Sequence, residues 1–404
     1  MSRKPSLLFL TQRIPYPPIK GEKIRRLPIL RHLRESYDVH LGCLVDDPAD
    51  IEHVPTVAAL CATSYFAPLD RRRAKITCLR GLLTGDPLSV TFFHDRGLQA
   101  WVRATMRAVR PDVVFICSSN MAAYVLDDPH RPRISLCDLA DVDSEKWRVY
   151  ARSGNPAMRL VHHREWKLTA KLEARIARDC DWSTFVSAEE AALFASLVPG
   201  QAARIRAVVS GVDAVYFDPA LDHQAVFDTT RPNYVFTGTM DYPPNMDAVQ
   251  WFAHHVLPVI RQHRPDAQFH VVGSSPAPAV AKLAEIDGVF VTGRVPDVRP
   301  YLAHATAGVA PMRIARGIQN KVLEAMAMAR PVVVTPDALE GIDAIANDEV
   351  LVASTQSEFA SACLQTLGSD ADAMGQAARR RVLADYVWSQ RLRGFDDLLQ
   401  GAPA

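Results

Sequence analysis

The chain has 404 residues, of which 48% are hydrophobic and 23% are charged, and its formal net charge is +1. This length suits two domains, and the near-neutral charge argues against a general nucleic-acid binder. The seven cysteines form no CxxC pair and no Cys/His spacing typical of a metal site, so we expect reduced thiols in the core. Because no apolar stretch is long enough for a signal peptide or a transmembrane helix, we expect a cytoplasmic protein.

The charge is unevenly spread along the chain. Residues 1–200 hold 29 Lys and Arg against 23 Asp and Glu, whereas residues 201–404 hold 17 against 22. A basic half suits an anionic partner, such as a membrane surface or a phosphorylated acceptor. The basic cluster at Arg71–Arg73, Lys75 and Arg80 is typical of a solvated face, and contact with lipid phosphate is the alternative.

The first half alternates strand and helix patterns, which predicts a parallel sheet covered by helices. The expected strands are Leu7–Thr11, Val39–Val45, Ser64–Ala67, Val113–Cys117, Ile134–Cys137 and Trp182–Val186. After the first strand, a proline-rich loop with several cations leads to Gly21 and a helix. This loop suits an acceptor or a phosphate, or it is a plain connection; it lacks the GxGxxG spacing of a dinucleotide site.

Three carboxylates, Asp138, Asp141 and Asp143, follow the strand Ile134–Cys137 and precede a helix. Asp141 and Asp143 have the spacing of a DxD metal motif, but Asp143 and Ser144 are also good helix N-cap residues, and we favour the helix start. Carboxylates at the end of a strand are well placed for chemistry. We therefore predict that Asp141 holds or deprotonates an acceptor hydroxyl, with Asp138 and Asp143 in the acceptor site.

A second series of strands and helices follows a junction at Val209–Pro219. Its expected strands are Tyr234–Thr237, Phe269–Val272, Val289–Thr292, Gly308–Ala310, Val332–Thr335 and Val350–Val352. We predict an α/β fold of two Rossmann-like domains, residues 1–205 and 206–370, with a cleft between them.

The stretch Ala310–Arg330 predicts a phosphate site, because a strand and a basic loop lead into a helix from Lys321 to Ala329. The helix N-terminus and its cations suit a diphosphate, and Glu324, one turn after Lys321, suits the hydroxyls of a ribose. A surface helix with a salt bridge is the alternative. The donor-site residues expected in this stretch are Arg313, Arg316, Gly317, Ile318, Lys321 and Glu324.

Two further loops follow strands of the second half. Gly238 and Thr239 lie in a small loop that can approach a phosphate, and Arg294 and Val295 lie where backbone groups can recognise a base. Because parallel strands present their carboxyl ends at one edge, we expect these loops to meet the stretch at Ala310–Arg330.

The combined motifs resemble family 4 glycosyltransferases of the GT-B fold, over nearly the whole chain. The stretches that carry the resemblance are VDAVYFDP, YVFTGTMDYPPNMDAV, VTGRVPDVRPYLAHA and APMRIARGIQNKVLEAMAMARPVVV. In the first half, LTQRIPYPPIKGEKIRR and DLADVDSEKWRVYARSG are similar to the sugar transferases associated with PEP-CTERM/exosortase loci and exopolysaccharide synthesis.

The resemblance implies a metal-independent, retaining hexosyltransferase without a cofactor. Its nucleotide-sugar donor, expected to be a UDP-sugar, would bind the C-terminal domain, and a saccharide or lipid-linked acceptor would bind the N-terminal domain. Glu324 would hold the ribose, and Gly21 would belong to the glycine loop of the acceptor site. The final helices, about residues 371–404, would pack back on the N-terminal domain. The enzyme would work in the cytoplasm, with peripheral contact at the inner face of the membrane as an option.

The chain departs from the family pattern in three ways. Arg316 stands where the first Glu of a Glu-x7-Glu motif is usual, the Arg/Lys pair after the first C-domain strand is absent, and Ala140 replaces a His. We therefore assign stabilisation of the diphosphate to Arg313, Arg316 and Lys321, and orientation of the acceptor to Asp141. A GT-B nucleotide-sugar epimerase and a non-catalytic nucleotide-sugar-binding protein are the alternative functions.

Overall fold

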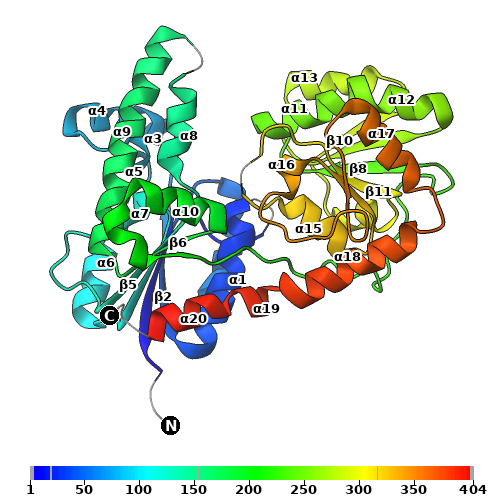
Figure 1. The fold of residues 1–404 in the computed structure, drawn as a ribbon. Coiled ribbons are helices and arrows are strands. Elements are labelled where there is room, and N and C mark those ends of the chain that lie inside the picture. Colours follow the sequence, from blue (N-terminus) through cyan, green and yellow to red (C-terminus); the bar gives the residue numbers. More distant parts are fainter. Residues whose placement is uncertain (1–3, 19–20, 153–154, 316, 401–404) are drawn as a thin grey trace. The chain divides into compact units, whose positions relative to one another are not determined.

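The computed structural model describes residues 4–18, 21–152, 155–315 and 317–400. They divide into two compact units, which we describe separately (Figure 1). The first unit comprises Met1–Val209 and Leu392–Ala404, and the second comprises Ser210–Arg391. The boundary thus lies four residues beyond the expected 205/206.

The described residues of the first unit form a seven-stranded sheet in which neighbouring strands pair in parallel. Its strand order is β3-β2-β1-β4-β5-β6-β7. The strands are β1 (Ser6–Thr11), β2 (Asp38–Val45), β3 (Thr63–Pro68), β4 (Val113–Cys117), β5 (Ile134–Ala140), β6 (Trp182–Phe185) and β7 (Ile205–Ala207). All residues of β1 and β4 are buried, so both faces of the sheet are covered there.

Helices connect these strands, and their patterns explain how they pack. In α6, the side chains of Leu98, Val102 and Met106 are buried at spacings of four, and Asp95 caps the N-terminus by accepting from the Leu98 N–H at 2.7 Å. The helices of this unit are α1 (Gly21–Ser36), η1 (Pro48–His53), α2 (Val54–Ala58), α3 (Arg71–Thr77), η2 (Cys78–Arg80), α4 (Gly81–Thr84), α5 (Leu88–Phe92), α6 (Arg96–Ala108), α7 (Ser119–Ala122), α8 (Asp143–Tyr150), α9 (Pro156–Asp179), α10 (Ala188–Leu197), η3 (Pro199–Arg204) and α20 (Arg393–Gln400).

The described residues of the second unit form a six-stranded parallel sheet of order β10-β9-β8-β11-β12-β13. Its strands are β8 (Asn233–Thr237), β9 (Gln268–Val272), β10 (Val289–Gly293), β11 (Ala307–Ala310), β12 (Val332–Val334) and β13 (Leu351–Val352). Its helices are α11 (Pro243–Trp251), η4 (Phe252–Val256), α12 (Leu257–His263), α13 (Pro278–Ala281), η5 (Lys282–Glu285), α14 (Arg299–Ala303), α15 (Asn320–Ala327), α16 (Pro336–Leu339), α17 (Gln356–Gln365), α18 (Ala371–Asp385) and α19 (Trp388–Arg391).

The predicted fold class, α/β with two Rossmann-like domains, is confirmed. In each sheet the strand order reverses beside the first strand, between β1 and β4 in one unit and between β8 and β11 in the other. Ligands of open parallel sheets bind outside the carboxyl ends of the strands at such a switch point. The fold therefore gives each unit one position at which to look for a site.

The last helices divide between the two units, which corrects our expectation for residues 371–404. Helix α18 belongs to the second unit, where a Cβ on Gly375 would come within 2.1 Å of the Ala329 carbonyl oxygen. Only from Leu392 does the chain rejoin the first unit. There Phe395 packs edge-on against Phe115 at 5.0 Å, and Asp396 contacts His32 at 2.8 Å, which sets α20 beside α1 (Figure 1).

No helix within the described residues has both the length and the apolar character needed to span a bilayer.

Candidate functional site

Close backbone packing forms the carboxyl edge of the second sheet. Gly238, just after β8, has a φ of 158°, and its N–H donates to the Val272 carbonyl at 3.0 Å. Just after the neighbouring strand β9, a Cβ on Gly273 would lie 1.7 Å from the Gly238 carbonyl oxygen, so only glycine fits there. The Asn245 side chain lies close to Gly238 and donates to the Thr239 carbonyl at 2.9 Å. These contacts fix the backbone of the loop that we predicted to approach a phosphate.

Lys321 lies in the first turn of α15, across the switch point from this loop. Its Nζ donates to Asn245 Oδ1 at 3.2 Å and to Gln319 Oε1 at 3.4 Å, and it lies 4.9 Å from the centre of the Phe236 ring. The side chain is half-buried. Its ammonium group thus contacts two neutral amide oxygens beside a helix N-terminus, a setting in which an anionic ligand supplies the missing charge.

Burial changes the pKa values of Lys321 and Glu324 more than the two residues change each other's pKa. Burial lowers the pKa of Lys321 to about 8, and the negative charge of Glu324 only partly opposes this. Burial likewise raises the pKa of Glu324 to about 7 against the influence of Lys321. Groups with such shifted pKa values in a strand-end site are candidates for function.

The loop between β11 and α15 holds further residues that we predicted for the donor site. Arg313 is half exposed; its Nε donates to Asp247 Oδ2 on α11 at 3.0 Å, and its guanidinium carbon lies 5.9 Å from the Trp251 ring centre. Its charge is therefore balanced by Asp247 in this structure. Gly317 is buried with a φ of 63°, and Ile318 is half-buried. Arg316 lies outside the described residues.

Arg294 and Val295 follow β10, which is the edge strand of this sheet. Arg294 is exposed and Val295 is half-buried. The preceding residue, Gly293, accepts from the Gly273 N–H at 3.2 Å, so the ends of β8, β9 and β10 are joined through their backbones. Arg294 and Val295 therefore share the edge of Gly238 but lie two strands away from it.

In the first unit, Asp138 is an interior residue, which contradicts its expected place in an acceptor site. Strand β5 continues to Ala140, so Asp138 lies within it and is 2% exposed. Arg25 donates from Nε to Oδ2 and from Nη2 to Oδ1, both at 2.9 Å, and Thr184 Oγ1 donates to Oδ1 at 2.8 Å. Both carboxylate oxygens are thus occupied by a buried ion pair that joins α1 to the sheet.

Asp141 and Asp143 follow the strand, and both contact Lys146. Lys146 Nζ lies 2.8 Å from Asp141 Oδ2 and 3.1 Å from Asp143 Oδ1. Burial alone would lower the pKa of Lys146. The charges of the two carboxylates outweigh this effect and raise that pKa above its usual value. The DxD spacing thus brings two carboxylates to one lysine. Asp141 remains one-third exposed at the end of β5, as its predicted role requires.

The turn that carries Asp141 is held by two buried glutamates. Glu190 of α10 accepts from the Val142 N–H at 2.8 Å, and Glu173 of α9 accepts from the Ser144 N–H at 3.2 Å. The residue before Asp141, Ala140, has a φ of 67°, which is unusual for any residue with a side chain. The surrounding structure therefore determines the backbone at Asp141 closely.

Three side-chain amides near the switch points were missed from the sequence, and Asn245 is one of them. The other two form the buried contact between Asn120 Nδ2 and Gln12 Oε1 at 2.7 Å, which joins α7 to the loop after β1. Asn120 Oδ1 has no partner within the part of the chain that the structure describes. Lone amides carry no motif, so no sequence signal could have found them. Gly21, which we predicted for the acceptor site, is the first residue of α1.

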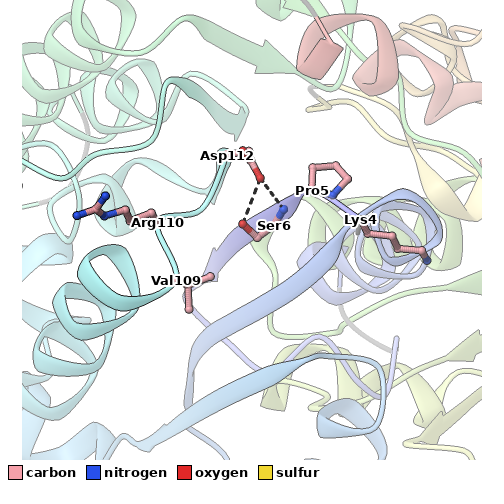
Figure 2. A pocket seen from close by; sticks show the side chains of 6 residues that line it. All are labelled: Lys4, Pro5, Ser6, Val109, Arg110 and Asp112. Atoms are coloured by element: carbon pink, nitrogen blue, oxygen red, sulfur yellow. Dashed lines mark hydrogen bonds between the residues drawn. The ribbon is translucent and has the colours of Figure 1, made fainter. Parts of the chain in front are cut away.

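A surface pocket lies at the amino edge of the first sheet, and none of the predicted site residues lines it. Figure 2 shows it at the amino end of β1, where Asp112 accepts from the Ser6 N–H at 2.8 Å and from Ser6 Oγ at 3.2 Å. Lys4, Pro5, Val109 and Arg110 complete its lining. Because ligands of parallel sheets bind at the carboxyl edge, we assign no function to this pocket.

Known proteins resemble this chain in sequence over part of its length and in fold over nearly all of it. Residues 231–369 match the model of a family described as "Glycosyl transferases group 1". A sucrose-phosphate synthase from Thermosynechococcus elongatus has a similar structure, with a TM-score of 0.69 and 16% sequence identity over 98% of both chains. The chain has the GT-B fold.

Other GT-B structures are similar over their full length. Anabaena HepE, solved with UDP and glucose, gives a TM-score of 0.68 at 12% identity over 98% of this chain and 100% of its own. A glycosyltransferase from Rickettsia africae gives 0.65 at 13% identity over 99% and 98%. No curated protein matches the sequence. The coarse class, a GT-B-type glycosyltransferase, thus rests on the family match and the fold together.

Proposed function

We propose that this GT-B glycosyltransferase moves a hexose from a UDP-sugar to a saccharide or lipid-linked acceptor. The observation that carries the proposal is the half-buried Lys321 at the N-terminus of α15, in contact with the neutral amide of Asn245 at the switch point. This arrangement offers one fixed positive charge and the N-terminal end of a helix to a diphosphate. The group 1 glycosyltransferase match spans the same residues.

In this proposal the donor lies along the carboxyl edge of the second sheet. Gly238 and Thr239 approach the diphosphate through their backbone, Lys321 balances its charge, and Glu324 accepts from the ribose hydroxyls. Arg294 and Val295 are assigned to the base, and Arg313, Gly317 and Ile318 to the loop that covers the donor. Arg316 is assigned to the diphosphate from the sequence alone. Uracil is preferred as the base because HepE was solved with UDP-glucose.

Departure of the diphosphate is the step that the second unit would accelerate. Negative charge develops on the leaving oxygen as the bond to the sugar breaks, and Lys321 and the N-terminus of α15 stabilise that charge without rearranging. Asp141 would orient the acceptor hydroxyl, with Asp143 and Gly21 in the same acceptor site. We propose retention of the anomeric configuration, family 4 chemistry and no metal requirement. Among the described residues, no group of three or more His, Cys, Asp or Glu is placed to hold a metal ion.

The biological setting we propose is exopolysaccharide or cell-envelope glycan synthesis of the PEP-CTERM type. The enzyme would act in the cytoplasm and contact the inner face of the membrane to reach a lipid-linked acceptor. This setting rests on the sequence resemblance and on the basic first half of the chain.

Thermal-shift measurements with UDP-, GDP-, ADP- and dTDP-sugars, each with and without EDTA, test the donor assignment. A ligand that binds only the folded state raises the melting temperature, so we expect a rise with UDP-sugars that EDTA leaves unchanged. A rise with another nucleotide alone would overturn the choice of base, and a rise abolished by EDTA would overturn metal independence. Turnover of the donor without any acceptor would favour the epimerase, and binding without turnover would favour a non-catalytic protein.

A further inference from the structure

The segment from Arg71 to Thr84, formed by α3, η2 and α4, turns an apolar stripe toward solvent. We call it the α3–α4 segment. Its side chains Ile76, Leu79 and Leu82 are 71%, 53% and 46% exposed. Their spacing of three residues aligns them along one side of a helical segment. Large apolar side chains at helical spacing normally face a core, so this stripe is turned the opposite way.

Basic side chains surround this stripe, and no acidic residue lies within the segment. It holds Arg71, Arg72, Arg73, Lys75 and Arg80, all exposed, between Asp70 and Asp86. The ion pairs to these bases are long: Arg73 Nε lies 3.5 Å from the exposed Asp70, and Arg71 Nε lies 3.9 Å from the buried Asp46, which Arg13 already contacts at 2.8 Å. Such pairs neutralise little charge, so the surface carries a net positive charge.

The α3–α4 segment is held firmly on α9. Arg164 of α9 donates to the Gly81 carbonyl and, at 3.1 Å, to the Asp86 carbonyl. The next residue, Glu165, accepts from the Leu88 N–H at 2.7 Å. Figure 1 shows α3 and α4 beside α9 in the first unit. The apolar stripe is therefore displayed by a fixed scaffold.

The first turns of α9 extend the same surface. Leu160 is 72% exposed and lies one turn before Arg164, on the side of α9 that contacts α4. Met158 is also exposed, and Arg159 between them adds another exposed positive charge. Two elements of one unit thus combine exposed aliphatic side chains with arginines.

We propose that the α3–α4 segment and the start of α9 form a surface that binds anionic lipid bilayers. Ile76, Leu79, Leu82 and Leu160 enter the boundary between headgroups and acyl chains, while the arginines contact lipid phosphates. This pattern of aliphatic and basic residues is that of helices that lie in a membrane interface. The positive charge, unopposed within the segment, selects an anionic bilayer over a neutral one. The inference deepens the proposed function, since a lipid-linked acceptor would be met at this surface.

Flotation of the full chain with vesicles tests the surface. The probes are vesicles of phosphatidylcholine alone and vesicles that also contain phosphatidylglycerol. We expect binding to the mixed vesicles only, weakened by salt because the charge term is screened. The triple variant Ile76→Ser/Leu79→Ser/Leu82→Ser should bind the mixed vesicles about tenfold more weakly or worse, as expected when several buried apolar groups are lost.

Two matched controls separate this surface from general effects. The first control, Leu197→Ser, removes a similarly exposed leucine on α10. The second control, Arg103→Glu/Arg107→Glu, reverses two exposed charges on α6. It is matched to the test variant Arg72→Glu/Arg73→Glu, which reverses two exposed charges on the α3–α4 segment. The controls should bind vesicles like the wild type, and the segment variants should not. All variants should keep the wild-type melting temperature and the same shift with a UDP-sugar.

Several results would overturn the proposal. These are the absence of flotation with anionic vesicles, equal flotation with neutral ones, and undiminished flotation of the triple serine variant. A wild-type dimer that the triple variant converts to a monomer, without vesicle binding, would assign the surface to a second copy of the chain instead. Because flotation needs no donor or turnover, its failure is distinct from failure of the transferase assignment.

Discussion

Lys321 Nζ and Asn245 Oδ1 lie 3.2 Å apart, and this contact joins the start of α15 to α11 across the β8/β11 switch point. Asn245 uses its amide nitrogen for the Thr239 carbonyl, so one buried side chain links the cation to the loop of Gly238. The hydrogen bond holds the ammonium group where a diphosphate is expected. It does so without a carboxylate, and the positive charge remains available to a ligand.

Replacing Lys321 by Met should impair transfer far more than folding. We expect kcat to fall by about 100-fold or more, the usual effect of removing one preorganised charge from a transition state. Stability should change little, because burial already disfavours the charged lysine. Initial rates with a UDP-sugar and the melting temperature measure the two effects. Lys282→Met, at an exposed lysine of the same unit, is the control, and equal rates for both variants would remove Lys321 from this role.

Asn245→Asp should weaken donor binding while keeping the shape of the site. A carboxylate in contact with Lys321 would neutralise its charge and repel the diphosphate, so we expect Kd for the nucleotide sugar to rise by about tenfold. Calorimetric titration measures this, and Asn347→Asp, outside the switch point, serves as the comparison. Unchanged or tighter binding by the Asn245 variant would show that the diphosphate lies elsewhere.

Donor affinity should depend on pH through Lys321. Its pKa of about 8 in the free protein means that it is charged below this pH and neutral above it. A diphosphate favours the charged form, so affinity is full below about pH 8 and declines as pH rises through that value. The Lys321→Met variant should lack this decline. A wild-type affinity that rises above pH 8 would contradict the assignment.

Asp138→Ala should lower the stability of the first unit and leave acceptor binding unchanged. The substitution removes the carboxylate that pairs with the buried guanidinium of Arg25, which costs about 3–5 kcal/mol in comparable buried pairs. Chemical denaturation of the wild type and the variant measures the difference in unfolding free energy. KM for the acceptor should be unchanged in the fraction that stays folded, and a change in KM without lost stability would restore Asp138 to the acceptor site.

Glu173 should make stability depend on pH. Burial raises the pKa of this carboxyl from 4.5 to about 8, so the folded state holds a proton that the unfolded state has lost. The free energy of unfolding should therefore fall as pH rises from about 5 to 8. Glu173→Gln, which keeps an oxygen for the Ser144 N–H, should reduce this slope. An identical slope in both proteins would mean that Glu173 is ionised in the folded state.

The sequence predicted the elements of both sheets well and the contacts between them poorly. Alternating apolar runs and helix patterns are local signals, so α15 was expected at Lys321–Ala329 and is found at Asn320–Ala327. By contrast, the expected strand Ile134–Cys137 continues to Ala140, and this extension buries Asp138. Its partner Arg25 lies 113 residues away, and no local pattern connects the two.

In the candidate site, too, the features with local sequence signals were predicted, and the contacts between residues distant in sequence were not. Strand ends, the glycines after them and the cation at the start of α15 could be found because each depends on neighbours in sequence. Asn245, and the pair of Gln12 and Asn120, depend on which strands lie side by side. Only the strand order of the two sheets makes these amides neighbours of a switch point.

A crystal structure of the chain with UDP bound is the measurement that tests the central claim most directly. Our account predicts the diphosphate against Lys321 Nζ and the first N–H groups of α15, the ribose hydroxyls on Glu324, and the Gly238 loop alongside. UDP bound away from the β8/β11 switch point, or a diphosphate that makes no contact with Lys321, would contradict it.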